Sequence, residues 1–229
     1  MSLILALETS TKNCSVALAE DDRVLAVREQ ATDGYVHAEK LHVFMDEVMR
    51  ETQRSFNELS AVAVGAGPGS YTGLRIGVSA AKGFCYTLGI PLISFNGLEI
   101  LAHQLIASEK LASEALIIPM IDARRMEVYT TIFNTSAEMQ CDVEAKIIDE
   151  TSFLELKGQP VYFIGDGAAK CREVLADEQW YFPDIIFPSA QQLALMAFHK
   201  LEEKRFEDVA YFEPFYLKEF RAGKPKKQV

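Results

Sequence analysis

The sequence predicts an α/β fold of two lobes, each with a mixed β-sheet covered by helices. Three observations support this prediction. The first ~95 residues follow the order strand, strand, strand, helix, strand, helix, strand, which is typical of a mixed sheet with helical crossovers. The second half repeats this order more loosely, and no Gly-, Ser- or Pro-rich linker separates the halves. The chain has 229 residues, 49% of them hydrophobic, and can bury a core without disulfides or metals. We expect lobes at 1–100 and 101–229.

The strands of the first lobe are short apolar runs bounded by polar turns, and its helices carry an apolar residue every three or four positions. Gly89 and Pro91 predict the end of the second helix. The expected strands are Leu3–Leu7, Cys14–Ala19, Val24–Gln30, Ala61–Gly65 and Pro91–Phe95, and the expected helices are 37–52, 72–88 and 97–110.

In the second lobe, a hairpin turn at Asp122 separates two apolar runs, and Ser189 is the expected N-cap of a long last helix. The expected strands are Ala115–Ile121, Val128–Phe133, Val143–Ile148, Pro160–Ile164 and Ile185–Phe187, and the expected helices are 152–156, 167–175 and 189–205.

The net charge of −10 argues against a chain that binds nucleic acid alone, because phosphate contacts need clustered Lys and Arg. The charge is uneven: residues 218–229 hold five basic groups and one acidic group, so the rest of the chain is near −14. This tail is either a solvated chain end or an electrostatic contact for RNA or an acidic partner.

The four cysteines have no metal or disulfide-framework spacing and are expected to be reduced, mostly buried thiols of a cytoplasmic protein. No apolar run approaches the ~18 residues of a membrane span, and the N-terminus does not resemble a signal peptide. We therefore expect no membrane association.

Two loops are candidates for nucleotide binding, and a third is either a turn or an anion site. The hydroxyl-rich turn Thr9, Ser10, Thr11 and Lys12 could wrap phosphates, although such turns are also ordinary hairpin turns. Gly165 and Gly167 follow a buried strand and could approach a ribose or adenine, but Asp166 between them would repel phosphate. The glycine-rich segment 65–73 matches neither common phosphate-loop pattern, so it is either a tight turn or an anion site at a helix start.

Two helical patterns suggest a surface for a partner. Small residues recur every fourth position at Gly73, Gly77 and Ala81, which permits close approach of the chain's own sheet or of a partner helix. Arg75 in the same turn suits a carboxylate or phosphate. The other pattern is an apolar stripe in the preceding helix, formed by Leu41, Phe44, Met45 and Val48.

A catalytic metal or a serine nucleophile is poorly supported. His37 and His42 are five residues apart, about 140° around a helix, so they do not share a face. Neither the His-Glu-x-x-His pattern nor G-x-S-x-G occurs.

The segments ILALETSTKNCSVALA, VGAGPGSYTGLRIGVSAAKGFCYTLGIPLISFNGLEILA, IPMIDARRMEVY and AYFEPFYLKEF together resemble the TsaB family of bacterial tRNA threonylcarbamoyladenosine biosynthesis proteins, which carries the older label of glycoprotease-like or M22 peptidase homologue. The resemblance spans nearly the full chain, and GPGSYTGLRIG is its most specific part. It implies the two-lobed actin/Hsp70/sugar-kinase (ASKHA, ribonuclease H-like) fold.

The resemblance also implies a function. The chain would be a non-catalytic subunit for threonylcarbamoyl transfer to N6 of adenosine 37 in ANN-decoding tRNAs. Its partners would be the catalytic paralogue TsaD and the ATPase TsaE, with tRNA bound only through the complex. The alternative is a metal-dependent hydrolase or an ATP-using transferase in its own right.

Family members pair through their N-terminal lobes, so the resemblance makes the residues of the stripe and the glycine ridge interface candidates and implies a homodimer when the chain is alone. It implies no cofactor of its own and leaves ATP or ADP binding at the interface of the complex open. The family's phosphate loop normally starts with Asp and contains Gly, whereas this chain has Glu8 and no glycine there. The helix also lacks the paralogue's His-x-x-x-His metal pair.

Overall fold

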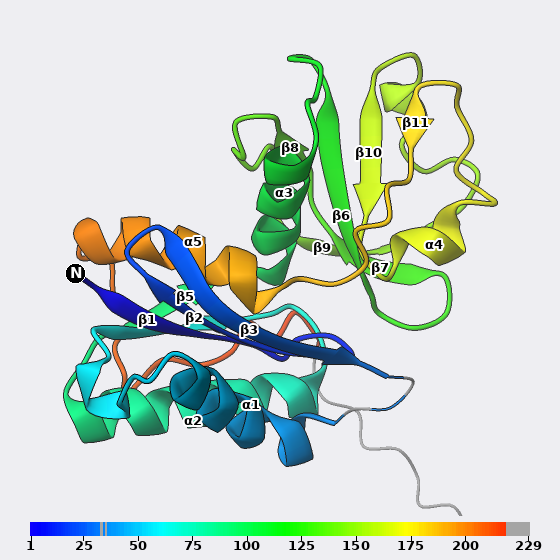
Figure 1. Ribbon diagram of the computed structural model, residues 1–229. Coiled ribbons are helices and arrows are strands. Elements are labelled where there is room, and N and C mark those ends of the chain that lie inside the picture. The colour runs from blue at the N-terminus through cyan, green and yellow to red at the C-terminus, as the bar shows by residue number, and fades with distance from the viewer. Residues whose placement is uncertain (33, 35, 219–229) are drawn as a thin grey trace, which may run out of the picture.

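A computed structural model of the chain describes residues 1–32, 34 and 36–218 (Figure 1). The first sheet has the strand order β3-β2-β1-β4-β5. The pairs β1–β2 and β2–β3 are antiparallel, whereas β1–β4 and β4–β5 are parallel. Its strands are β1 Leu3–Glu8, β2 Asn13–Glu20, β3 Arg23–Ala31, β4 Ala61–Gly65 and β5 Leu92–Phe95.

The second sheet repeats this topology, with the order β11-β10-β6-β7-β9 and with β8 also paired to β6. The pairs β6–β7 and β7–β9 are antiparallel, whereas β6–β10 and β10–β11 are parallel. Its strands are β6 Leu116–Asp122, β7 Glu127–Thr130, β8 Phe133–Asn134, β9 Glu144–Ile147, β10 Val161–Ile164 and β11 Trp180–Tyr181. The predicted mixed sheets and duplicated order are therefore confirmed.

Helices cover both faces of the first sheet (Figure 1). The helices α1 (His37–Glu51) and α2 (Tyr71–Leu88) lie on one face, and α5 (Ala190–Glu202) lies on the other. Because strand side chains alternate between faces, Leu5 packs in the core with α1 and α2, whereas Ile4 packs with α5. The strand β1 between these two cores is buried along its whole length.

The ends of α2 and α3 follow from local chemistry. Ser70 caps α2 by accepting the Gly73 N–H at 3.3 Å, and Gly89 ends it in the left-handed conformation with φ 66°. The Asn96 side chain caps α3 (Gly97–Ser108) by accepting the Leu98 N–H at 2.8 Å.

The helices cross the expected lobe boundary at residue 100. Helix α3 packs against β6 of the second sheet, whereas α5, near the end of the chain, packs against β1 and β2 of the first. The division into 1–100 and 101–229 stays a prediction: α3 spans residue 100, and of the described helices only α5 packs against the sheet of the other half of the chain.

Several expected elements of the second lobe are shorter or different. The predicted strand Ile185–Phe187 is wrong: the segment is an irregular linker between prolines 183 and 188, which cannot donate to a β-ladder. The expected helix at 167–175 is a single turn, α4 (Ala168–Cys171), and 152–156 contains only the 3₁₀ turn Leu154–Leu156. The run Val128–Phe133 is divided between β7 and β8. Three short 3₁₀ or α turns, including Phe56–Glu58 after α1, complete the described helices.

No helix in the described ranges is long and apolar enough to cross a bilayer. All four cysteines are free thiols, and Cys141 is the exposed one among them.

Candidate functional site

The turn between β1 and β2 is buried under the two helices that follow it. Thr9, Ser10 and Thr11 are almost fully buried. The Thr9 hydroxyl donates to Gly73 O at 2.8 Å, the Ser70 N–H donates to Ser10 O at 2.7 Å, and His37 Nε2 lies 2.8 Å from Thr11 O. The turn is therefore fastened to the starts of α1 and α2, and the Thr9 hydroxyl is engaged by the chain itself.

Glu8, which ends β1, is fully buried beside Gly65 at the end of β4. Its Oε1 accepts the Ser10 N–H at 2.6 Å, while its Oε2 has no hydrogen-bond partner among the described residues. Burial raises the pKa of Glu8 to about 7, against the lowering effect of the Ser10 hydrogen bonds. A β-carbon on Gly65 would occupy the place of this carboxyl, so glycine is required there.

The glycine ridge of α2 packs within the chain. A β-carbon on Gly73 would clash with Thr9 O, and one on Gly77 would clash with the Thr9 hydroxyl. Ala81 is fully buried in the core beneath α2. Contacts within the chain therefore account for all three small residues: Gly73 and Gly77 admit the turn after β1, and Ala81 packs in the first core.

The loop Gly165-Asp166-Gly167 closes on the second sheet in a similar way. Gly165 has φ 100°, and a β-carbon there would clash with Met120 O. The Gly167 N–H donates to the same carbonyl at 2.9 Å, and Asp166 Oδ1 accepts the Asp122 N–H at 2.9 Å. Burial raises the pKa of Asp166 to about 6, and Lys12 from the first lobe opposes that rise. These hydrogen bonds lie within the second lobe, and nucleotide binding at these residues stays a prediction.

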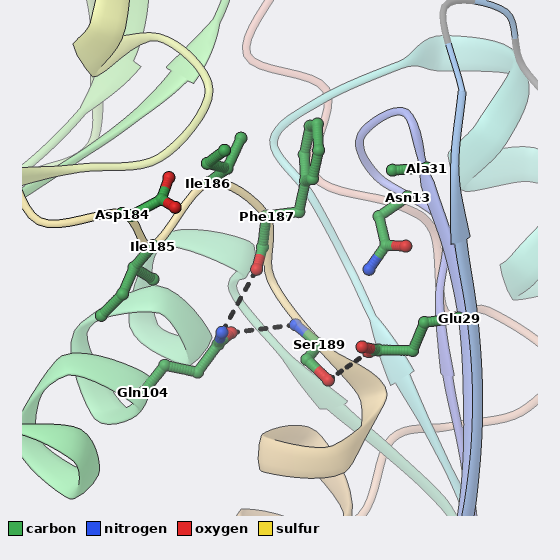
Figure 2. A pocket seen from close by; sticks show the side chains of 9 residues that line it. All are labelled: Asn13, Glu29, Ala31, Gln104, Asp184, Ile185, Ile186, Phe187 and Ser189. Carbon is green, nitrogen blue, oxygen red and sulfur yellow. Dashed lines mark hydrogen bonds between the residues drawn. The ribbon is translucent and has the colours of Figure 1, made fainter.

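A groove of about 410 Å³ lies beside this region, between β3 and the linker before α5 (Figure 2). The Gln104 side chain connects the linker to α3 through two hydrogen bonds. Its Nε2 donates to Phe187 O at 3.2 Å, and its Oε1 accepts the Ser189 N–H at 2.9 Å. The Glu29 carboxylate accepts hydrogen bonds from the hydroxyls of Ser15 and Ser189. None of the predicted nucleotide-binding residues lines this groove, whose side chains join the lobes.

The apolar stripe of α1 is part of the first core. Leu41, Met45 and Val48 are fully buried or nearly so, and Phe44 is almost as buried. These four side chains pack against the sheet and α2, so in this structure they are not presented to a partner. A partner that docks on α1 would instead meet the residues on the helix's outer side.

The outer side of α1 and α2 carries apolar groups that the sequence pattern did not single out. Val43 is 46% exposed and Tyr86 is 84% exposed. Gly83 is exposed, and a β-carbon there would meet nothing within 4 Å. Unlike Gly77, it has no reason within the chain to be glycine. It follows Ile76 by seven residues and Ala80 by three, so these three share one helix face, on which Ile76 and Ala80 are partly buried against the first core. We call Val43, Ile76, Ala80, Gly83 and Tyr86 the outer helix face.

Arg75 lies at the edge of this face, against the end of the chain. Residues 206–218 form a strap that returns from α5 across β5 and α2 (Figure 1). Lys82 Nζ holds the strap by donating to Ala210 O at 3.2 Å and Phe212 O at 2.9 Å. The Arg75 guanidinium donates to the Tyr216 hydroxyl at 3.4 Å, which raises the pKa of Arg75 further.

Lys218 is the one residue of the basic tail that the structure describes; the rest of the tail lies outside the described residues.

Within the described ranges, no three His, Cys, Asp or Glu side chains come together as a metal-binding group. His37 is buried at the start of α1 with Nε2 against the first turn, whereas His42 is exposed on the same helix. The two histidines of α1 therefore lie in different environments, one buried and one exposed.

Comparison with known proteins gives consistent results. The family model described as "TsaD: tRNA N6-adenosine threonylcarbamoyltransferase" matches residues 34–223. The tRNA threonylcarbamoyladenosine biosynthesis protein TsaB of Bacillus subtilis is 31% identical over 181 residues, covering 76% of this chain and 75% of the relative. The Haemophilus influenzae protein of the same name is 26% identical and covers 94% of this chain and 93% of the relative.

Solved structures agree with this match. YeaZ from Pseudomonas aeruginosa superposes with a TM-score of 0.81 at 26% identity, over 95% of this chain and all of that one. An inorganic polyphosphate/ATP-glucomannokinase from Arthrobacter has a TM-score of 0.52 at 9% identity, over 90% of this chain and 100% of that one. This second likeness concerns the fold alone and identifies it as the actin/Hsp70/sugar-kinase type.

Proposed function

The chain belongs to the TsaB branch of the TsaD glycoprotease-like family, and from this premise we propose that it is a non-catalytic subunit in the threonylcarbamoylation of tRNA. Its role is to bind the catalytic subunit TsaD and hold it in a working state, with the ATPase TsaE joining the assembly. The observation that supports a binding role is the outer helix face. That face exposes apolar side chains and a glycine that the chain's own packing does not require.

We propose that α1 and α2 meet the corresponding helices of the partner through this face. Gly83 permits the close approach of a second helix, and Val43 and Tyr86 supply apolar area around it. The same surface serves a second copy of the chain when no partner is present, which gives the homodimer. In this proposal the interface is formed by the outer helix face, which a partner can reach, and not by the buried apolar stripe of α1 or the Gly73–Ala81 ridge of α2.

The buried turn supports a subunit without a nucleotide of its own. Thr9 donates its hydroxyl to α2, and the close approaches at Gly69 and Gly73 are filled by backbone atoms of the turn. Any ATP or ADP in the assembly would then be held at the interface of the complex. A second activity, as a hydrolase or transferase, requires nucleotide or substrate turnover by the purified chain alone.

The proposal is tested by reconstitution. Threonylcarbamoyladenosine formation on an ANN-decoding tRNA is assayed with TsaD and TsaE, with and without this chain. We expect product only with the chain, and no nucleotide turnover by the chain alone. Equal product without it, or sustained ATP hydrolysis by the isolated chain, overturns the assignment.

Paired variants test the surface. Val43→Lys places a charge on the outer helix face and should abolish co-elution with TsaD on a sizing column. Ile147→Lys is the matched control, since Ile147 is 70% exposed on β9 of the second lobe and should not matter. Equal co-elution of both variants would contradict the assigned face.

A further inference from the structure

A series of cations and aromatic rings crosses from the first lobe to the second along the end of the strap. At its first-lobe end, the Arg75 guanidinium lies 4.5 Å from the centre of the Tyr71 ring. The Tyr71 and Tyr216 rings lie 5.1 Å apart, and Tyr216 is 37% exposed. Two residues further along the chain, Lys218 reaches the second sheet.

At the second-lobe end, Lys218 forms an ion pair with Glu127, and its Nζ lies 5.5 Å from the centre of the Tyr129 ring. Burial raises the pKa of Tyr129, and the positive charges of Lys218 and Arg124 oppose that rise. Arg124, in the hairpin turn between β6 and β7, is thus a second positive charge in the neighbourhood of this ring. The side chains that share this arrangement are Tyr71, Arg75, Tyr216, Lys218, Tyr129 and Arg124, which we call the basic–aromatic belt.

The hairpin turn contributes two guanidinium groups without acidic partners. Arg124 and Arg125 are both exposed, and neither forms an ion pair with any residue in the described part of the chain. Both have positive φ, 72° and 55°, so two successive arginines occupy a backbone conformation better suited to Gly or Asn.

The nearby carboxylates are already engaged. Asp122 accepts hydrogen bonds from Lys170 and from the Arg124 N–H, the latter at 2.9 Å. Asp166 accepts the Asp122 N–H, and Glu127 is paired with Lys218. The turn therefore presents two uncompensated positive charges in a fixed place on a chain whose net charge is −10.

We propose that the basic–aromatic belt, together with Arg125, contacts the RNA substrate when this chain is part of its complex. Guanidinium and ammonium groups neutralise phosphates, and an exposed aromatic ring such as that of Tyr216 stacks on an unpaired base. An acidic protein surface would match the cations but would make no use of the exposed ring of Tyr216. The inference rests on the proposed function, because an acidic chain alone is unsuited to hold RNA.

The test measures binding of a fluorescently labelled ANN-decoding tRNA transcript to the complex of this chain with TsaD, by anisotropy at several salt concentrations. The double variant Arg124→Asn, Arg125→Gly removes both charges and installs residues that favour positive φ, so it should fold at least as well as the wild type. Loss of two phosphate contacts should weaken binding roughly 20-fold at about 0.1 M salt and lower the salt slope by about 1.5.

Two further variants separate charge from stacking. Tyr216→Leu should weaken binding about tenfold with an unchanged salt slope, whereas Tyr216→Phe should bind like the wild type, because it keeps the ring. Arg23→Gln is the matched control, since Arg23 is exposed at the β2–β3 turn and has no ion pair within the described ranges.

Co-elution with TsaD is measured first for every protein. If the variants form the complex and bind tRNA with wild-type affinity and slope, the belt proposal is overturned while the proposed function stands. If the arginine variant binds tRNA normally but loses TsaD or TsaE from the complex, the belt is a protein contact and the RNA assignment is wrong. If the wild-type chain and TsaD do not associate, both proposals fail.

Discussion

The two glycines of α2, Gly77 and Gly83, should respond to substitution in opposite ways. A β-carbon at Gly83 would meet nothing within 4 Å, so Gly83→Ala adds only helix propensity and should raise the free energy of unfolding by about 1 kcal/mol. For a chain of this length, that corresponds to about 2–4 °C in Tm. At Gly77, a β-carbon would clash with the Thr9 hydroxyl, which is hydrogen-bonded to Gly73 O. Gly77→Ala should therefore lower the free energy of unfolding by about 1–3 kcal/mol.

The assay has two parts. Thermal and urea unfolding of the isolated chain compare the two alanine variants with the wild type. Association with TsaD is then measured by titration for Gly83→Leu, whose side chain fits the isolated chain but would occupy the space of a partner helix. We expect association to be weaker by roughly 5- to 150-fold, from an overpacking cost of about 1–3 kcal/mol.

Ala107→Leu is the control, because Ala107 is an exposed small residue of α3 on the second lobe. Wild-type affinity of Gly83→Leu would refute the close approach at this face. A loss of stability on Gly83→Ala would show that Gly83 is required by the chain itself.

Three further predictions concern the core, the buried carboxyl and the strap. Leu41→Ala should lower the free energy of unfolding by about 2–5 kcal/mol in urea, because Leu41 is fully buried; a loss below 1 kcal/mol would mean that the stripe is not core. Glu8 has its pKa raised to about 7 by burial, so the folded state holds this proton more tightly than the unfolded state. The stability that Glu8 contributes is complete below about pH 4.5 and is lost as the pH rises through about 7, a loss of roughly 3 kcal/mol in the free energy of unfolding. In Glu8→Gln the free energy of unfolding should therefore depend less on pH between about pH 5 and 8 than in the wild type. Equal pH dependence in the two proteins would contradict this assignment. Lys82→Met removes two hydrogen bonds to the strap, so limited proteolysis should cleave the strap faster than in the wild type. Lys40→Met on α1 is the control and should be cleaved at the wild-type rate. Equal cleavage rates in the two variants would refute this role of Lys82.

Much of the fold was predictable because the signals are local. The alternation of apolar runs and turns in the first 95 residues, the Ser70 and Asn96 caps and the Gly89 stop lie within a few positions of the element that they delimit. The error at Ile185–Phe187 has the same origin. An apolar run resembles a buried strand, and only the prolines at 183 and 188 argued against it.

The candidate site was less predictable. Gly77 and Gly83 are equivalent in sequence, since both are glycines within one helix. The chain packs Thr9 against the first and leaves the second open. Burial of Leu41, Phe44, Met45 and Val48 likewise depends on the sheet that α1 covers, which no local pattern specifies.

By itself, the sequence determined the α/β class, the duplicated strand order and the family, because periodicity, capping and motif spacing are properties of neighbouring residues. Tertiary structure alone decided which small residues face inward and which carboxylates around Arg124 and Arg125 are already engaged. It also decided that Tyr71, Tyr129 and Tyr216 belong to one belt. The physical reason is that burial and charge pairing join groups far apart in the chain, such as Lys218 and Glu127.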